Sequence, residues 1–227
     1  MTVLLGVAHG TRNPAGARTT GELLGLVREL RPWLAVGEAY AEISSPSIGE
    51  EVRRLGYPSL VVVPLLLGRG YHVHVDIPKQ LAEAGADAVV VQPLGPHAEL
   101  TSVLVERLGE GVEADAVVLG AAGSTSPEGV ADVRHAARQL GRRIGRPVAF
   151  GFVGGPEPAL ADVVAQMRER GARTVAIASY LLAPGFFHGR LAAAGADFTA
   201  PPLGAHPALA RLVLRRFDEG IAGARVA

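Results

Sequence analysis

Histidines and a carboxylate stand at the ends of apolar segments in the first half of the chain. His72 and His74, two of seven histidines, follow the run "LVVVPLLLG" and a Gly-Arg-Gly turn. His9 follows the run "VLLGVA", and Glu42 ends a third such segment. Imidazole and carboxylate groups accept protons and bind divalent transition metals. These residues therefore indicate acid–base or metal chemistry, although His9 also fits a hydrogen-bonded loop residue and Glu42 a polar strand end.

The elements that position these residues alternate between short apolar runs and amphipathic helical segments. The apolar runs lack polar alternation, which indicates parallel strands buried on both faces and covered by helices. We predict strands near Val3–Ala8, Val36–Ile43, Leu60–Leu67, Ala88–Gln92, Ala116–Ala121, Val148–Phe152, Thr174–Tyr180 and Asp197–Ala200. The predicted helices include Arg18–Leu30, Ser47–Leu55, Leu100–Leu108, Val130–Ile144 and Ala159–Arg170.

The chain repeats its own pattern. "LLGVAHGTRNPAG" aligns without gaps to "VVLGAAGSTSPEG", and a "PLGxH" run occurs in both halves, ending at His97 and at His206. We therefore predict an α/β fold of two similar doubly wound domains, residues 1–112 and 113–227, each with a four-stranded parallel sheet and helices on both faces. The shared place of the two histidines ahead of a helix predicts a capping or turn-forming role.

The second half lacks the polar residues of the first. Ala122 aligns with His9, and Gly154 falls opposite Glu42. A histidine also follows the third strand of the second half, but His188 pairs with the histidine of the first half only after a one-residue slip. We therefore predict that the first domain carries the site and that the site of the second is degenerate.

Strand order decides which of these residues can meet. In doubly wound sheets with the order 2-1-3-4, ligands bind at the carboxyl ends of strands one and three. Neighbouring strands lie about 4.8 Å apart, so His9 and His72 can face one small space that Glu42 also reaches. His74 shares that face if its segment is extended and diverges if it is helical. Asp76 precedes "IPKQLAEAG" and has the place of a helix N-cap.

Composition narrows the class of protein. Acidic and basic residues cancel at 22 each, so we expect no nucleic-acid partner. The chain has no cysteine, which excludes disulfides and thiolate chemistry and permits a reducing cytosol. The start "MTVLLGVAHG" has no basic signal-peptide region, and the apolar runs are shorter than the roughly 20 residues of a membrane helix. We expect a soluble cytoplasmic protein with no membrane partner, either a monomer or a homodimer.

Three segments together resemble a known family. "VAHGTRNP", "AEISSPS" and "VVVPLLLGRGYHVHVDIP" are similar to segments of the sirohydrochlorin chelatases, the class II chelatases that insert iron or cobalt into a tetrapyrrole. The resemblance implies insertion of Fe²⁺ or Co²⁺ into sirohydrochlorin or a related tetrapyrrole, for sirohaem or cobalamin synthesis. It also implies a lyase with no permanent cofactor, the metal being a substrate. The chain has no Walker-type motif, so we expect no need for ATP.

The resemblance also implies roles for single residues. His9 and His72 become the catalytic pair with Glu42 assisting, and the same three residues become transient metal ligands. One residue departs from the family pattern, since Ser45 stands where a second glutamate is common. The candidate substrate-binding residues are Arg12, Arg69 and Ser44.

Two other functions fit the same residues. A metallohydrolase would use His72 and His74 as an HxH metal pair, and it would need further ligands at other strand ends. A carrier of metal or tetrapyrrole would use the same site without turnover. A histidine phosphatase fits less well, because its Arg-His-Gly signature needs an arginine where this chain has Ala8.

Overall fold

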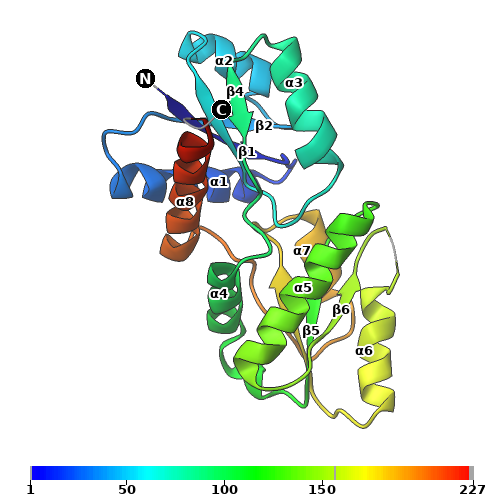
Figure 1. Cartoon of the computed structure of the whole chain (residues 1–227). Helices are drawn as coiled ribbons and strands as arrows, with labels where there is room; N and C mark the ends of the chain where they lie inside the picture. Colours follow the sequence, from blue (N-terminus) through cyan, green and yellow to red (C-terminus); the bar gives the residue numbers. More distant parts are fainter. Residues whose placement is uncertain (1, 156, 225–227) are drawn as a thin grey trace. The chain divides into compact units, whose positions relative to one another are not determined.

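The chain forms two compact units in the computed structural model, which describes residues 2–155 and 157–224. One unit comprises the residues up to Leu94 together with those from Ala205 on, and the other comprises Gly95–Gly204. Each unit holds a four-stranded parallel sheet, in the order β2-β1-β3-β4 and β6-β5-β7-β8 respectively (Figure 1). The predicted α/β class with two doubly wound parallel sheets is confirmed.

The first unit carries the strand ends at which the candidate site lies. Its strands are β1 (Val3–Ala8), β2 (Val36–Tyr40), β3 (Leu60–Pro64) and β4 (Ala88–Val90). Its helices are α1 (Pro14–Leu30), α2 (Ile48–Leu55), a π-helix (His72–Asp76), α3 (Ile77–Glu83) and α8 (Pro207–Ala224). The predicted strands Val36–Ile43 and Leu60–Leu67 are too long at their carboxyl ends, because the chain leaves the sheet at Tyr40 and Pro64 to form the loops of the site.

The second unit repeats the same order of elements. Its strands are β5 (Ala116–Ala121), β6 (Ala149–Phe152), β7 (Val175–Tyr180) and β8 (Phe198–Thr199). Its helices are α4 (Ala98–Leu108), a 3₁₀-helix (Gly109–Glu113), α5 (Pro127–Ile144), α6 (Leu160–Glu169) and α7 (Phe186–Ala192). The central strands β5 and β7 are apolar and almost wholly buried, as the lack of polar alternation predicted.

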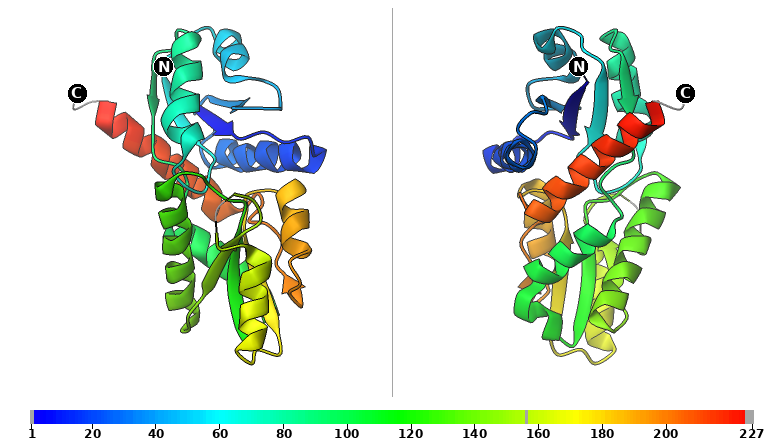
Figure 2. Two further views of the ribbon diagram at one scale, coloured as in Figure 1. Left: turned by 90° about the vertical axis from the view of Figure 1, so that its right-hand side faces the viewer. Right: turned by 60° about the vertical axis from the view of Figure 1, so that its left-hand side comes forward.

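The two halves of the sequence exchange their last helices: α8, at the end of the second half, belongs to the first unit, and α4, at the end of the first half, belongs to the second unit. Helix α8 lies against α1 and β3 of the first unit, and α4 lies against α5 and β7 of the second (Figures 1 and 2). The compact units therefore differ from the expected division into residues 1–112 and 113–227. A bidentate ion pair from Arg31 to Asp218, at 2.6 and 2.9 Å, joins α8 to the end of α1.

The described residues include no helix that combines the length and the apolar character needed to cross a membrane.

Two glycines of α8 test how this helix packs. A Cβ atom at Gly220 would lie 2.6 Å from Val61 Cγ1 and 2.7 Å from Val91 Cγ1, whereas a Cβ atom at Gly223 would meet nothing within 4 Å. We expect Gly220→Ala to lower the free energy of unfolding by about 1–3 kcal/mol, because valine is rigid and the site would be overpacked. Gly223→Ala is the matched control and should stabilise the helix by up to about 1 kcal/mol.

Calorimetry measures both effects, and hydrogen exchange locates them. Amide protection should fall in β3 of Gly220→Ala and stay unchanged in β7. Loss of protection in β7 instead would contradict the assignment of α8 to the first unit.

Candidate metal site at the carboxyl ends of β1, β2 and β3

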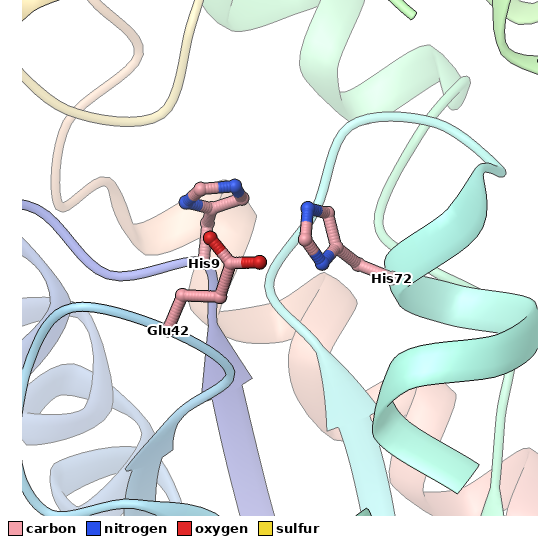
Figure 3. A group of neighbouring side chains, drawn as sticks. All are labelled: His9, Glu42 and His72. Carbon is pink, nitrogen blue, oxygen red and sulfur yellow. The ribbon is translucent and has the colours of Figure 1, made fainter. Parts of the chain in front are cut away.

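Three side chains from three separate loops meet at one edge of the first sheet. His9 directly follows β1, Glu42 lies in the loop after β2, and His72 begins the π-helix after β3. One ligand atom from each residue lies within 4.8 Å of the other two (Figure 3). The strand order β2-β1-β3 places these loops side by side, so residues 63 positions apart in sequence come together.

The two imidazole rings meet edge to face. Their centroids are 4.5 Å apart and their planes lie at 83°. His9 Nδ1 lies 3.2 Å from the carbonyl oxygen of Gly10, and because a carbonyl only accepts, Nδ1 carries the proton in this contact. The lone pair of the neutral His9 ring is then on Nε2, where it can bind a cation.

A close backbone approach holds Glu42 beside His9. The Glu42 amide donates to the His9 carbonyl at 2.9 Å. Gly10 has a φ of 102°, and a Cβ atom there would lie 1.8 Å from the Glu42 carbonyl oxygen. Only glycine fits such a position, because it tolerates positive φ and has no Cβ atom. The sequence pattern His-Gly is therefore one structural unit, in which the glycine admits the loop that carries the carboxylate.

Ser44 ties the same two loops together. Its hydroxyl accepts a hydrogen bond from the Thr11 amide and donates one to the Thr11 carbonyl, both at 2.9 Å. In the structure, the hydroxyl of Ser44, which was predicted to bind substrate, makes these two hydrogen bonds within the protein. Of the two predicted substrate-binding arginines, Arg12 is exposed and Arg69 is half-buried.

Asp76 orients His72, and the prediction that it is an N-cap is wrong. It has helical dihedral angles and makes no side-chain capping bond. Its carboxylate instead lies 3.0 Å from His72 Nδ1 and accepts a second hydrogen bond from Gln80 at 2.9 Å. Gln80 also donates to the carbonyl of Ala41 at 2.8 Å, which links α3 to the loop after β2.

The electrostatics of Asp76 fix the tautomer of His72. Burial acts to raise the pKa of Asp76, but the hydrogen bonds from Gln80 and His72 and the attraction of His72 and His9 outweigh it. The pKa of Asp76 is therefore below its ordinary value of 3.8, so the group is an ionised acceptor at neutral pH. His72 Nδ1 then donates, and Nε2 is left for a metal ion, as in carboxylate–histidine–metal arrangements.

The other predicted histidines lie outside this group. His74 is exposed and falls within the helical turn, where residues two apart point in different directions. An HxH metal pair is therefore not formed in this conformation. His97 and His206 accept hydrogen bonds from the amides of Glu99 and Ala208, at 3.1 and 3.0 Å, so their predicted capping role is confirmed.

The second unit keeps the backbone of the site without its side chains. A Cβ atom at Gly123 would lie 1.7 Å from the carbonyl oxygen of Gly154, which repeats the approach of Gly10 to Glu42. Ala122 stands in the place of His9 and Gly154 in the place of Glu42, so neither position has a side chain that can bind a metal.

Phe187 takes the third position at the corresponding strand ends of the second unit. The Leu203 amide donates to the Leu181 carbonyl, and the equivalent bond in the first unit runs from the Leu94 amide to the Leu66 carbonyl. Because Leu181 is thus equivalent to Leu66, Phe187 is equivalent to His72. The expected one-residue slip that would pair His188 is therefore wrong. His188 Nε2 lies 3.3 Å from the carbonyl of Ala200 instead, within its own unit.

Comparison with known proteins agrees with the fold and the duplication. The protein-family model CbiX matches the chain twice, over residues 3–111 and 116–220. The chain belongs to the CbiX family. The resemblance drawn from the three sequence segments is confirmed.

Two curated relatives are similar to part of the chain. One is a sirohydrochlorin cobaltochelatase of Sulfurisphaera tokodaii, 32% identical over 108 residues that cover 46% of this chain and 88% of the relative. The other is a chloroplastic sirohydrochlorin ferrochelatase of Arabidopsis thaliana, 31% identical over 110 residues that cover 45% of this chain and 49% of the relative.

Solved structures share the fold along the whole chain. SirB from Bacillus subtilis with Fe³⁺ superposes with a TM-score of 0.79 at 22% identity, covering 99% of this chain and 97% of that one. A CbiX described as the terminal enzyme for siroheme biosynthesis in denitrifying bacteria has a TM-score of 0.72 at 22% identity, covering 96% of this chain and 98% of that one. At this identity the likeness is one of fold.

The first prediction from this geometry concerns Asp76. We expect Asp76→Asn to weaken Co²⁺ binding by about 10–100-fold, because the neutral side-chain amide of the variant holds His72 Nδ1–H less firmly than the carboxylate does. Asp87→Asn is the matched control, because Asp87 lies at the amino end of β4 in the same sheet, and it should leave the affinity unchanged. Calorimetric titration with Co²⁺ measures both. Equal affinity in Asp76→Asn and the unmodified protein would contradict the orienting role.

A second prediction uses the two equivalent glycines. Gly10→Ala and Gly123→Ala introduce the same backbone clash in the two units. Both should lower the melting temperature, but only Gly10→Ala should displace a ligand and reduce Co²⁺ affinity, by about tenfold or more. A loss of similar size in Gly123→Ala would place the binding site elsewhere.

Proposed function

We propose that this protein inserts Fe²⁺ or Co²⁺ into sirohydrochlorin or a related tetrapyrrole without ATP, as a step towards sirohaem or cobalamin. The observation that carries the proposal is the group of His9, Glu42 and His72, whose ligand atoms lie within 4.8 Å of one another. Membership of the CbiX family and the activities named for the two curated relatives support it.

The chemistry needs bases and a loosely held metal at one place. Insertion removes two pyrrole N–H protons and delivers an M²⁺ ion to the four ring nitrogens, so charge balances when two protons leave. Neutral imidazoles can hold the ion and accept protons as it departs. A permanent structural site has four protein ligands in a closed shell. Two imidazoles and one exposed carboxylate bind less firmly, which allows the ion to be transferred.

Each residue then has a distinct task. His9 and His72 present Nε2 to the incoming cation, and Glu42 supplies a negative charge that offsets that of the ion. Asp76 acts as a positioning residue, because it contacts His72 and not the metal. Arg12 and Arg69, which lie in the loops after β1 and β3, pair with the peripheral carboxylates of the substrate.

The test compares the two histidines of the metal group with a third histidine that lies outside it. Sirohydrochlorin mixed with Co²⁺ or Fe²⁺ changes its absorption spectrum when the metal enters the ring. We expect His9→Ala and His72→Ala each to reduce the rate of this change at least about 100-fold, because each removes a ligand and a base. His74→Ala is the matched control, two positions from His72, and should retain the rate.

The outcomes separate the competing functions. Loss in His74→Ala comparable to that in His72→Ala would indicate an HxH metal pair that includes His74. Binding of Co²⁺ and sirohydrochlorin by the unmodified protein, without acceleration of the spectral change, would favour a carrier and overturn the proposed catalysis.

A further inference from the structure

Ile43 has an unfavourable backbone conformation next to the metal group. Its φ is 64°, in the left-handed region, and the residue is 60% exposed. A β-branched residue in this region is a conformational outlier, because its two Cβ substituents crowd the backbone. Such strain persists where the surrounding structure enforces it, and it is concentrated at functional sites.

The second unit shows that this turn does not require an isoleucine. The Tyr40 amide donates to the Pro46 carbonyl and the Phe152 amide donates to the Pro158 carbonyl, both at 2.9 Å. The two loops are therefore equivalent, and Gly155 takes the place of Ile43. Gly155 has a φ of 84° and makes the turn without strain. The strained residue therefore occurs in the unit that has the ligating side chains, and the relaxed residue in the unit that lacks them.

The turn that carries Ile43 is fixed at both sides to the loop after β1. Glu42 is bound through its amide to His9, and Ser44 is bound through its hydroxyl to Thr11. Ile43 thus lies between two anchored residues and next to the Glu42 ligand. An exposed aliphatic side chain in this position neither fills the core nor caps a helix.

A second exposed apolar residue adjoins the other side of the group. Tyr71 immediately precedes His72 and is 60% exposed, and the centroids of the two rings are 5.8 Å apart. Glu42 and His72 therefore each have an exposed apolar neighbour in sequence. Polar ligands flanked by exposed apolar side chains suit a flat, apolar ring that carries polar nitrogen atoms at its centre.

We propose that Ile43 is a substrate-binding residue whose aliphatic side chain lies against the face of the tetrapyrrole ring. The inference rests on the proposed function and adds a residue that selects a flat macrocycle. The strain in the turn is offset in the complex, because apolar surface of Ile43 is removed from water there. Glycine at this position would relieve the strain but give up the contact.

The experiment compares two non-glycine residues that both have a positive φ. Tyr57 is the other described non-glycine residue with positive φ, at 57°, and it is 55% exposed at the end of α2. Asparagine tolerates the left-handed region, so Ile43→Asn and Tyr57→Asn should each raise or preserve the melting temperature. Both should bind Co²⁺ alone as the unmodified protein does.

The two variants should differ in tetrapyrrole binding. We expect Ile43→Asn to weaken metal-free sirohydrochlorin binding about tenfold and to raise KM with little change in kcat, because burial of the apolar side chain is lost. Tyr57→Asn should change neither quantity. Ile43→Leu, which keeps an apolar side chain, should bind nearly as the unmodified protein does.

The failures of the two proposals are distinguishable. If the unmodified protein accelerates metal insertion but Ile43→Asn binds sirohydrochlorin with unchanged affinity, the role of Ile43 is overturned and the proposed function stands. If Ile43→Leu weakens binding as much as Ile43→Asn, the apolar contact is also contradicted. If the unmodified protein neither binds nor metallates sirohydrochlorin, both proposals fall.

Discussion

The close approach of the loop after β2 to Gly10 is the constraint on which the site depends. Because Gly10 has no Cβ atom, the Glu42 carbonyl can approach its Cα atom more closely than a side chain would allow. A hydrogen bond from the Glu42 amide to the His9 carbonyl holds the loop there. The parallel order β2-β1-β3 then brings the loop of His72 to the same edge. The second unit obeys the same constraint with Gly123 and Gly154, so the backbone alone does not make a site. Function in this fold resides in the side chains that the edge carries.

The arrangement suits a cation that is held and then released. Asp76 contacts Nδ1 of His72, while the carbonyl of Gly10 contacts Nδ1 of His9. Both rings are thereby oriented before a metal arrives, which reduces the entropy lost on binding. The third group, Glu42, is exposed and less constrained. A site with two oriented imidazoles and one exposed carboxylate can accept a hydrated ion and also give it up.

Much of this could be predicted from the sequence, for reasons that also mark where prediction fails. Continuous apolar runs identified the parallel strands, and strand order then brought His9, Glu42 and His72 together. The role of Asp76 was missed, because it depends on a π-helix that places residues 72 and 76 on one side. Ile43 was predicted within a strand, since its apolar type gives no sign of positive φ. The amphipathic pattern of α8 shows which face is buried but not which sheet covers it.

Anomalous diffraction from crystals soaked in Co²⁺ would locate the bound ion. We expect one strong peak about 2.1 Å from Nε2 of both His9 and His72, with the Glu42 carboxylate adjacent and Asp76 hydrogen-bonded to Nδ1 of His72. A cobalt ion bound by His74, or a peak in the second unit with none between these two imidazoles, would contradict it.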